Sequence, residues 1–159
     1  MASKRVVTAL PGEQTISFTR EFEAPAALVF RAHTEADLVA RWTGPAGTEV
    51  RMREWDARSG GAWSYVVAGG GGEWGFHGAF HEVTKPRRIV MTFEFEGHPE
   101  HPNLEILNFV DLAGGRCQLE GLSLFPTLAD RDDMLSDMDS GMDENFERLD
   151  ALIAAGELG

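Results

Sequence analysis

The longest regular pattern of apolar residues lies at the C-terminal end of the chain, in residues 127–155. Its apolar positions recur at helical intervals: Leu128, Leu135, Met138, Met142, Phe146, Leu149 and Ile153. This spacing predicts one long amphipathic helix. Thr127 can cap its first turn, and Gly156 marks its end. At 1.5 Å per residue the helix is about 40 Å long, so it needs a wide apolar surface to lie on.

The preceding part of the chain is patterned as short strands. Residues 14–23 alternate between apolar and polar, which predicts a half-buried strand. Pro25 starts a short helix, and a second short helix ends near Trp42. Glycine and proline turns then separate six further segments with strand character. These strands are predicted at residues 48–56, 62–68, 73–83, 88–95, 103–112 and 116–125.

Short connections between successive strands favour antiparallel pairing. The sequence therefore predicts an α+β fold built on a curved antiparallel sheet of about seven strands. Two short helices follow the first strand, and the long C-terminal helix lies over the concave face. Residues 1–13 are expected to form an N-terminal lead-in, and residues 14–156 a single domain.

The composition narrows the range of partners. The formal net charge is -12 over 159 residues. Such an acidic chain is unsuited to nucleic acid or to anionic membranes, which attract clustered lysine and arginine. Cys117 is the one cysteine in the sequence, so no intramolecular disulfide can form, which fits a reducing compartment. No apolar run is long enough for a membrane span or a signal core, and we expect a cytoplasmic protein.

Four short motifs occur in order along the chain. They are REFEAP at residues 20–25, ARWTGP at 40–45, DARSGGAW at 56–63 and SLF at 123–125. Together with the order of the elements, these motifs resemble the Hsp90 ATPase activator homologue 1-like family of the START-like superfamily, also called SRPBCC or Bet v 1-like. The resemblance runs from about residue 15 to residue 153. It implies a helix-grip fold with an apolar cavity between the sheet and the C-terminal helix.

The resemblance also implies a class of function. Members of this superfamily mostly bind hydrophobic small molecules, and a minority catalyse reactions. The family motif carries a second aromatic residue after Trp42, where this chain has Thr43, so no ring contact is expected there at the cavity mouth. Co-chaperone activators of Hsp90 carry an additional N-terminal domain for which this chain has no room, which disfavours stimulation of Hsp90.

The walls of the expected cavity follow from the two patterns. The helix contributes the central part of its apolar stripe: Leu135, Met138, Met142 and Phe146. Alternate strand residues give the opposite wall: Val50, Met52, Trp63, Tyr65, Phe76, Phe80, Met91, Phe93, Ile106, Asn108 and Leu119. Gly78 shares a face with Phe76 and Phe80, and its missing side chain would let the helix or a ligand come close to the sheet. Each of these residues is equally compatible with plain core packing.

Few polar residues are expected inside this cavity. Arg20 falls on the apolar face of its strand, so either it meets a carboxylate or a ligand anion, or the strand end has emerged into solvent. Tyr65 and Arg20 are the inward candidates for acid–base chemistry. Glu54 or His77 would join them if one strand face is inverted.

The histidines do not predict a metal site. His77 and His81 lie on one side of a strand but about 13 Å apart, too far to share one metal. At His98 and His101 a surface metal is conceivable, but the polar setting and two prolines of this segment favour a plain turn. The sequence also lacks a Ser-His-Asp order, a phosphate-binding glycine loop and paired cysteine ligands. No metal, cofactor or catalytic residue is therefore assigned.

The sequence leaves three functions open. The first is non-catalytic binding of a small hydrophobic ligand, as a carrier or sensor, by a monomer or a homodimer. The second is an enzyme of the cyclase, hydratase or aromatase kind that uses the same cavity. The third is a chaperone-related or regulatory interaction protein, which modulates a chaperone or a transcription factor and docks through the acidic face of the C-terminal helix. That face carries Asp132, Asp133 and Asp137.

Overall fold

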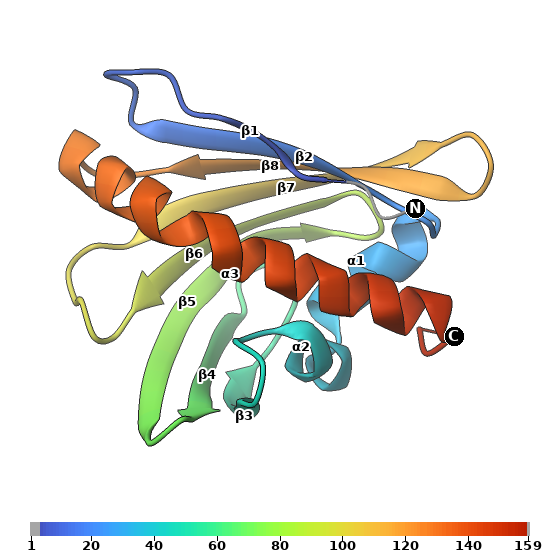
Figure 1. The fold of residues 1–159 in the computed structure, drawn as a ribbon, viewed down its shortest axis with the longest axis horizontal. Coiled ribbons are helices and arrows are strands. Elements are labelled where there is room, and N and C mark those ends of the chain that lie inside the picture. Colours follow the sequence, from blue (N-terminus) through green and yellow to red (C-terminus); the bar gives the residue numbers. More distant parts are fainter. Residues whose placement is uncertain (1–3, 159) are drawn as a thin grey trace.

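The computed structural model describes residues 4–158, apart from the side chains of residues 137–140. Within this part of the chain, one curved antiparallel sheet of eight strands has the order β1-β2-β8-β7-β6-β5-β4-β3 (Figure 1). The strands are β1 Val6–Thr8, β2 Thr15–Phe22, β3 Glu49–Trp55, β4 Ala62–Gly69, β5 Gly72–Thr84, β6 Arg88–Phe95, β7 Asn103–Leu112 and β8 Arg116–Leu124. The helices are α1 Ala26–Thr34, α2 Ala36–Trp42 and α3 Leu128–Ala154. The predicted α+β helix-grip architecture is confirmed.

The sheet has one strand more than the apolar pattern predicts. The short β1 lies in the segment expected to be a lead-in and pairs antiparallel with β2, with Val6 opposite Thr19. Three residues are too few to show an alternating pattern, which explains why the sequence alone does not reveal this strand.

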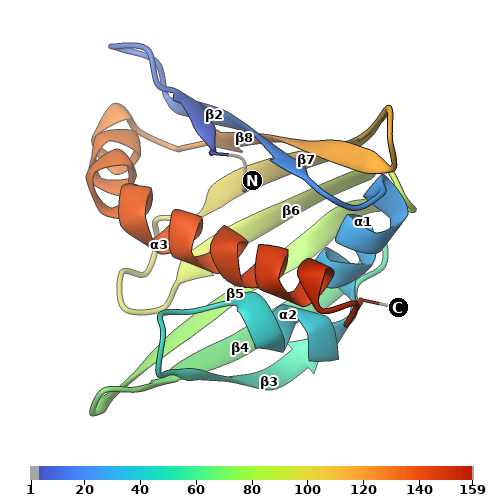
Figure 2. The ribbon, with the colours of Figure 1, turned by 45° about the vertical axis from the view of Figure 1, so that its right-hand side comes forward.

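The curvature of the sheet has local causes. The pairing register shifts between Met52 and Glu54 on β3 and between Phe80 and Glu82 on β5. Such β-bulges bend a strand and increase its twist. The bent sheet presents a concave face, and Figure 2 shows α3 lying across that face.

The long helix α3 is held at both of its ends. At its start, Thr127 Oγ1 accepts a hydrogen bond from the backbone N–H of Asp130 at 3.1 Å, as the predicted cap requires. One turn further, the buried Arg131 donates from Nη1 to the carbonyls of Leu10 and Thr15 at 2.9 and 3.3 Å. The helix ends before Gly156, whose φ of 72° is a conformation that favours glycine.

The two short helices close one end of the curved sheet. Phe30 of α1 packs edge-on against Phe109 of β7, with 5.2 Å between ring centroids. Trp42, at the end of α2, stacks on Phe146 of α3 and donates from Nε1 to the carbonyl of Ala32 at 2.9 Å. None of the helices in the described part of the chain combines the length and apolar character needed to cross a membrane.

Candidate ligand-binding site

The concave face is sealed at one end and partly open at the other. At the sealed end, Phe146 of α3 is buried and packs its ring against Phe18 and Phe22, at centroid distances of 5.8 and 5.4 Å. Elsewhere on the face, four apolar residues of β3, β5 and β6 that pack against the same core remain partly exposed: Met52, Phe76, Met91 and Phe93. Inward apolar surface that the fold leaves partly uncovered is the main component of small-molecule sites.

The partly open end adjoins the first turns of α3. The chain leaves β8 at Leu124 and enters α3 at Leu128, so the helix begins at the end of the sheet where β6 finishes and β7 starts (Figure 2). Leu128 is 39% exposed and Leu135 is partly exposed, whereas Leu149 near the other end of the helix is fully buried. Among the described residues, these apolar side chains near the start of α3 are therefore less completely covered than Leu149 near its end.

Five aromatic side chains, here called the aromatic cluster, form a connected group on β4, β5 and β6. They are Trp63, Tyr65, Phe76, Phe93 and Phe95. Neighbouring rings in the cluster lie 5.1 to 5.5 Å apart between centroids, which is the range of favourable aromatic contacts. Phe76 and Phe93 are partly exposed, so the cluster offers aromatic ring surface to a bound molecule.

A carboxyl group lies on the same concave face. Glu105 of β7 is the cross-strand partner of Met91 on β6 and of Ser123 on β8. One carboxyl oxygen accepts a hydrogen bond from Ser123 Oγ at 2.5 Å, and the other accepts one from Asn103 Nδ2 at 2.5 Å. Ser123 and Asn103 are themselves buried, so the carboxyl group is held in a fixed position.

The surroundings of Glu105 change its acidity. Burial raises the pKa of Glu105 from 4.5 to about 7, and the hydrogen bonds from Ser123 and Asn103 offset only part of this rise. The carboxyl therefore occupies both protonation states near neutral pH. It belongs to a row of successive cross-strand partners that runs across five strands: Phe80, Met91, Glu105, Ser123 and Ile16.

Arg20 has a partner within the protein. It points inward, as its alternation predicts, and is 4% exposed. Its guanidinium donates to both carboxyl oxygens of Asp150 on α3, at 2.7 and 2.6 Å, and lies 4.6 Å from the centroid of the Phe22 ring. Of the alternatives that the sequence left open, the structure shows a carboxylate partner. The Arg20 side chain therefore holds α3 on the sheet through this ion pair.

The other candidates for acid–base chemistry are poorly suited to it. Burial raises the pKa of Tyr65, so its phenol keeps its proton at neutral pH. Glu54 is exposed on β3. His77 is exposed as well, and its Nδ1 lies 2.9 Å from a carboxyl oxygen of Glu96. Glu105, which the sequence did not single out, is a carboxyl group that the fold brings onto the concave face.

Most of the residues predicted to line a cavity lie in or against the core. Five are buried in the core cluster: Trp63, Tyr65, Phe80, Leu119 and Phe146. Six are partly buried and pack against it: Val50, Met52, Phe76, Met91, Phe93 and Met142. Leu135 is partly buried on α3, and the side chain of Met138 lies outside the described residues. That these side chains contact a ligand stays a prediction.

The prediction for β7 was wrong in its register. Leu107 and Phe109 belong to the core, so alternation places Ile106 and Asn108 on the opposite face of the sheet. Asn108 there accepts a hydrogen bond from Arg88 Nη1 at 3.2 Å. Both faces of this strand carry apolar residues, so the pattern does not decide between them, and a shift of one residue inverts every assignment. Because the predicted register of β7 was inverted, Glu105 was assigned to the outer face and did not appear among the predicted site residues.

Gly78 allows a close approach, as predicted, but the group that approaches is a core side chain. A Cβ atom at this position would lie 2.6 Å from Nε1 of Trp63 and 2.0 Å from the carbonyl oxygen of Thr92. The Trp63 indole crosses the strand here and donates from Nε1 to that carbonyl at 3.2 Å. The missing side chain therefore positions the tryptophan of the aromatic cluster.

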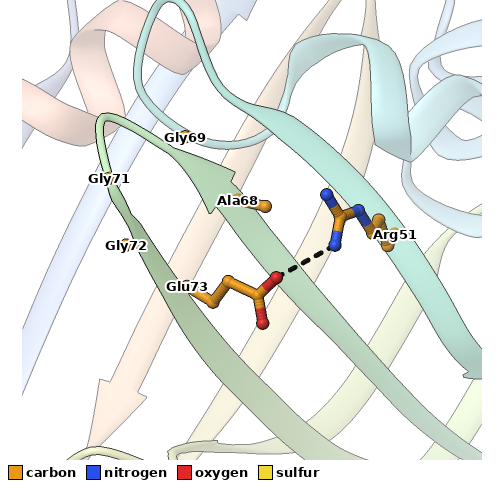
Figure 3. A pocket seen from close by; sticks show the side chains of 6 residues that line it. All are labelled: Arg51, Ala68, Gly69, Gly71, Gly72 and Glu73. Atoms are coloured by element: carbon orange, nitrogen blue, oxygen red, sulfur yellow. Dashed lines mark hydrogen bonds and ion pairs between the residues drawn. The ribbon is translucent and has the colours of Figure 1, made fainter.

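A hollow lies at the tip of the β4–β5 hairpin, away from the concave face. It has a volume of about 440 Å³ and is lined by Arg51, Ala68, Gly69, Gly71, Gly72 and Glu73. Figure 3 shows the ion pair that spans it, in which Arg51 Nη1 lies 3.0 Å from a carboxyl oxygen of Glu73. Apart from the methyl group of Ala68, the lining offers little apolar surface, so the hollow is a poor site for an apolar ligand.

The comparison with protein families supports the assignment of the fold. The model of the family described as Activator of Hsp90 ATPase homolog 1-like protein matches residues 23–154. The chain belongs to this family. The resemblance to the Hsp90 ATPase activator homologue 1-like family, expected from the four sequence motifs, is thereby confirmed.

Solved structures of other proteins show the same fold as this family member. A protein from Rhodobacter sphaeroides aligns with a TM-score of 0.86 and 23% identity, covering 95% of this chain and 98% of that one. A protein from Chromobacterium violaceum aligns with a TM-score of 0.74 and 26% identity, covering 87% and 96%. An HSP90 activator from Plasmodium falciparum aligns with a TM-score of 0.53 and 21% identity, covering 70% and 72%. A search of curated proteins gives no significant match.

Proposed function

We propose that this protein binds a small, largely apolar molecule with one hydroxyl or amine group on the concave face of its sheet, beneath the first half of α3. The observation that carries the proposal is Glu105, a carboxyl group set among apolar side chains that remain partly exposed. Placing a carboxyl in such surroundings costs stability, and a ligand that donates a hydrogen bond would offset this cost. The helix-grip fold of the family supports the same reading.

The two parts of the site are suited to the two parts of such a ligand. A carboxylate has about four acceptor positions, of which Ser123 and Asn103 use two. The remaining positions are available for a donor on the ligand. The aromatic cluster and Met91 would bury its apolar body, because aromatic rings and flexible methionine side chains adapt to irregular shapes.

Binding can be measured with N-phenyl-1-naphthylamine, an uncharged fluorescent probe that carries one N–H group. We expect one saturable site per chain. Replacing Met91 with tryptophan fills the space beside Glu105 and should weaken binding about tenfold or more, the factor that corresponds to 1.4 kcal/mol. Native mass spectrometry of the freshly purified protein would show whether a molecule from the host already occupies the site.

The matched control is Val110→Trp, which adds the same side chain at a position that is 42% exposed on the neighbouring strand β7. This variant should bind the probe as the wild type does. Probe fluorescence that never saturates, or equal affinity in the wild type and in Met91→Trp, would count against the proposed site.

The same carboxyl group favours a second candidate function, acid–base catalysis in the site. A pKa of about 7 lies where a general acid or base works best at neutral pH. This corresponds to the enzyme alternative drawn from the sequence, with Glu105 in place of the residues considered there. A carboxylate in apolar surroundings is also a stronger base than one in water, because its charged form is poorly solvated.

The Kemp elimination of 5-nitrobenzisoxazole tests for such a base without knowledge of the natural substrate. A base removes the ring C–H proton, the N–O bond breaks, and a coloured phenolate is released. We expect the rate to rise with pH with a midpoint near 7 and to fall at least about 100-fold in Glu105→Gln. Glu54→Gln, which alters an exposed carboxyl, serves as the control. A rate that is the same in all three proteins would exclude this role.

A further inference from the structure

Two histidines and an aspartate meet at the partly open end of the molecule. His98 and His101 lie in the loop between β6 and β7, and Asp130 lies in the first turn of α3. Each residue offers one ligand atom, and these atoms all lie within 4.8 Å of one another. The loop and the helix are separated by strands β7 and β8 along the chain, so only the folded protein brings the three side chains together.

The side chains of this group, here called the His–His–Asp cluster, contact one another directly. His101 Nδ1 lies 2.6 Å from a carboxyl oxygen of Asp130, and the rings of His98 and His101 are nearly parallel, with 3.9 Å between centroids. The Asp130 side chain is 10% exposed, whereas that of His101 is 39% exposed. The cluster thus has a partly desolvated carboxylate beneath and two accessible imidazoles above.

We propose that the His–His–Asp cluster binds a divalent transition metal ion, with Zn²⁺ as the best fit. Imidazole nitrogen and carboxylate oxygen are zinc ligands at about 2.0–2.2 Å, and tetrahedral geometry would place them about 3.4 Å from one another. Side-chain rotation within the exposed loop can bring the ligand atoms from their present separation to that distance. Water would fill the fourth position. Mg²⁺ and Ca²⁺ are disfavoured because they prefer oxygen ligands.

Two further features favour a cation at this place. The chain carries a net charge of -12, and Asp132 and Asp133 are exposed in the same turns of α3, so the local potential attracts cations. The metal would also join the β6–β7 loop to the start of α3, whose capping depends on Thr127 rather than on the Asp130 side chain. This proposal reverses the expectation from the sequence, in which the position of Asp130 beside the histidines was not visible.

Isothermal titration of ZnCl₂ into the tag-free protein tests the proposal. We expect one Zn²⁺ per chain and no uptake of Mg²⁺. His98→Ala and His101→Ala should each weaken binding at least about tenfold, the loss that removal of even an outer-shell partner typically causes. His81→Ala, which removes an exposed histidine of β5, should leave binding unchanged.

A second measurement keeps the test independent of the titration. Saturating Zn²⁺ should raise the melting temperature of the wild type, because a ligand that binds only the folded state stabilises it, and should have no such effect on His101→Ala. Absence of Zn²⁺ uptake by the wild type would overturn the proposal. Uptake that is equal in the wild type, His98→Ala and His101→Ala would overturn it too, because the ion would then bind elsewhere on the acidic surface.

Discussion

Replacing Asp150 with alanine is expected to lower the free energy of unfolding by about 3 kcal/mol. The Arg20 guanidinium, which is 4% exposed, would lose both hydrogen bonds to the carboxylate and remain charged inside the protein. Leaving a buried charge without its partner costs far more than the pair itself contributes. Urea unfolding, followed by far-UV circular dichroism, would give the free energy.

Two comparisons separate this effect from a general loss of charge. Glu157→Ala removes a carboxylate whose ion pair with Arg41 is exposed, and it should cost less than about 1 kcal/mol. The double variant Arg20→Met, Asp150→Leu removes both charges together and should be much more stable than the sum of the single effects predicts. If Asp150→Ala costs no more than Glu157→Ala, Arg20 is not the buried anchor described here.

Replacing Glu105 with glutamine is expected to stabilise the protein at pH 8 and to have little effect near pH 4.5. Burial raises the pKa of Glu105 from 4.5 to about 7 in the folded state, so the folded state holds this proton more tightly than the unfolded state. Stability from this group therefore falls as the pH rises from about 4.5 to about 7 and is constant above that range. At about 1.36 kcal/mol per pKa unit, the effect reaches at most about 3 kcal/mol.

The measurement is a series of urea unfolding experiments on both proteins across this pH range. The difference in unfolding free energy between the variant and the wild type removes the contributions that all other titrating groups make to both proteins. Glu120→Gln, which makes the same substitution at an exposed position of the neighbouring strand β8, is the control for the change of side chain itself. A stability difference between Glu105→Gln and the wild type that does not change with pH would show that Glu105 has an ordinary acidity in the folded state.

The fold could be predicted from the sequence because its signals are long and mutually consistent. The stripe of apolar residues along α3 and the cap at Thr127 predicted the helix. The glycine and proline turns predicted where the successive strands begin and end. The strand β1 was missed because three residues are too few to show an alternation of apolar and polar positions. The antiparallel order follows from short connections, which need no knowledge of side-chain contacts.

The site could be predicted only in part, because it depends on strand register. On β4 the sequence assigned Trp63 and Tyr65 to the inner face correctly, because the polar Ser64 between them marks the opposite face. On β7, Ile106 and Leu107 are adjacent and equally apolar, so alternation alone could not reveal that Glu105 faces inward. On β8 the alternation of inward residues runs from Cys117 through Leu119 and Gly121 to Ser123. This alternation was the one indication in the sequence that a polar residue, and with it the cross-strand pair Glu105–Ser123, lies on the inner face.

The two anchors of α3 have a consequence for the rate at which a bound molecule would exchange. Arg131 ties the first turns of the helix to the carbonyls of Leu10 and Thr15, and Asp150 ties its later turns to Arg20. Lifting the helix from the sheet would break both sets of contacts, which makes it a local unfolding event on a timescale of about microseconds to seconds. Rotation of side chains such as Met91 and Phe93 takes about picoseconds to nanoseconds when they are exposed. Under the proposed function, a ligand therefore enters and leaves past these side chains while the helix stays in place.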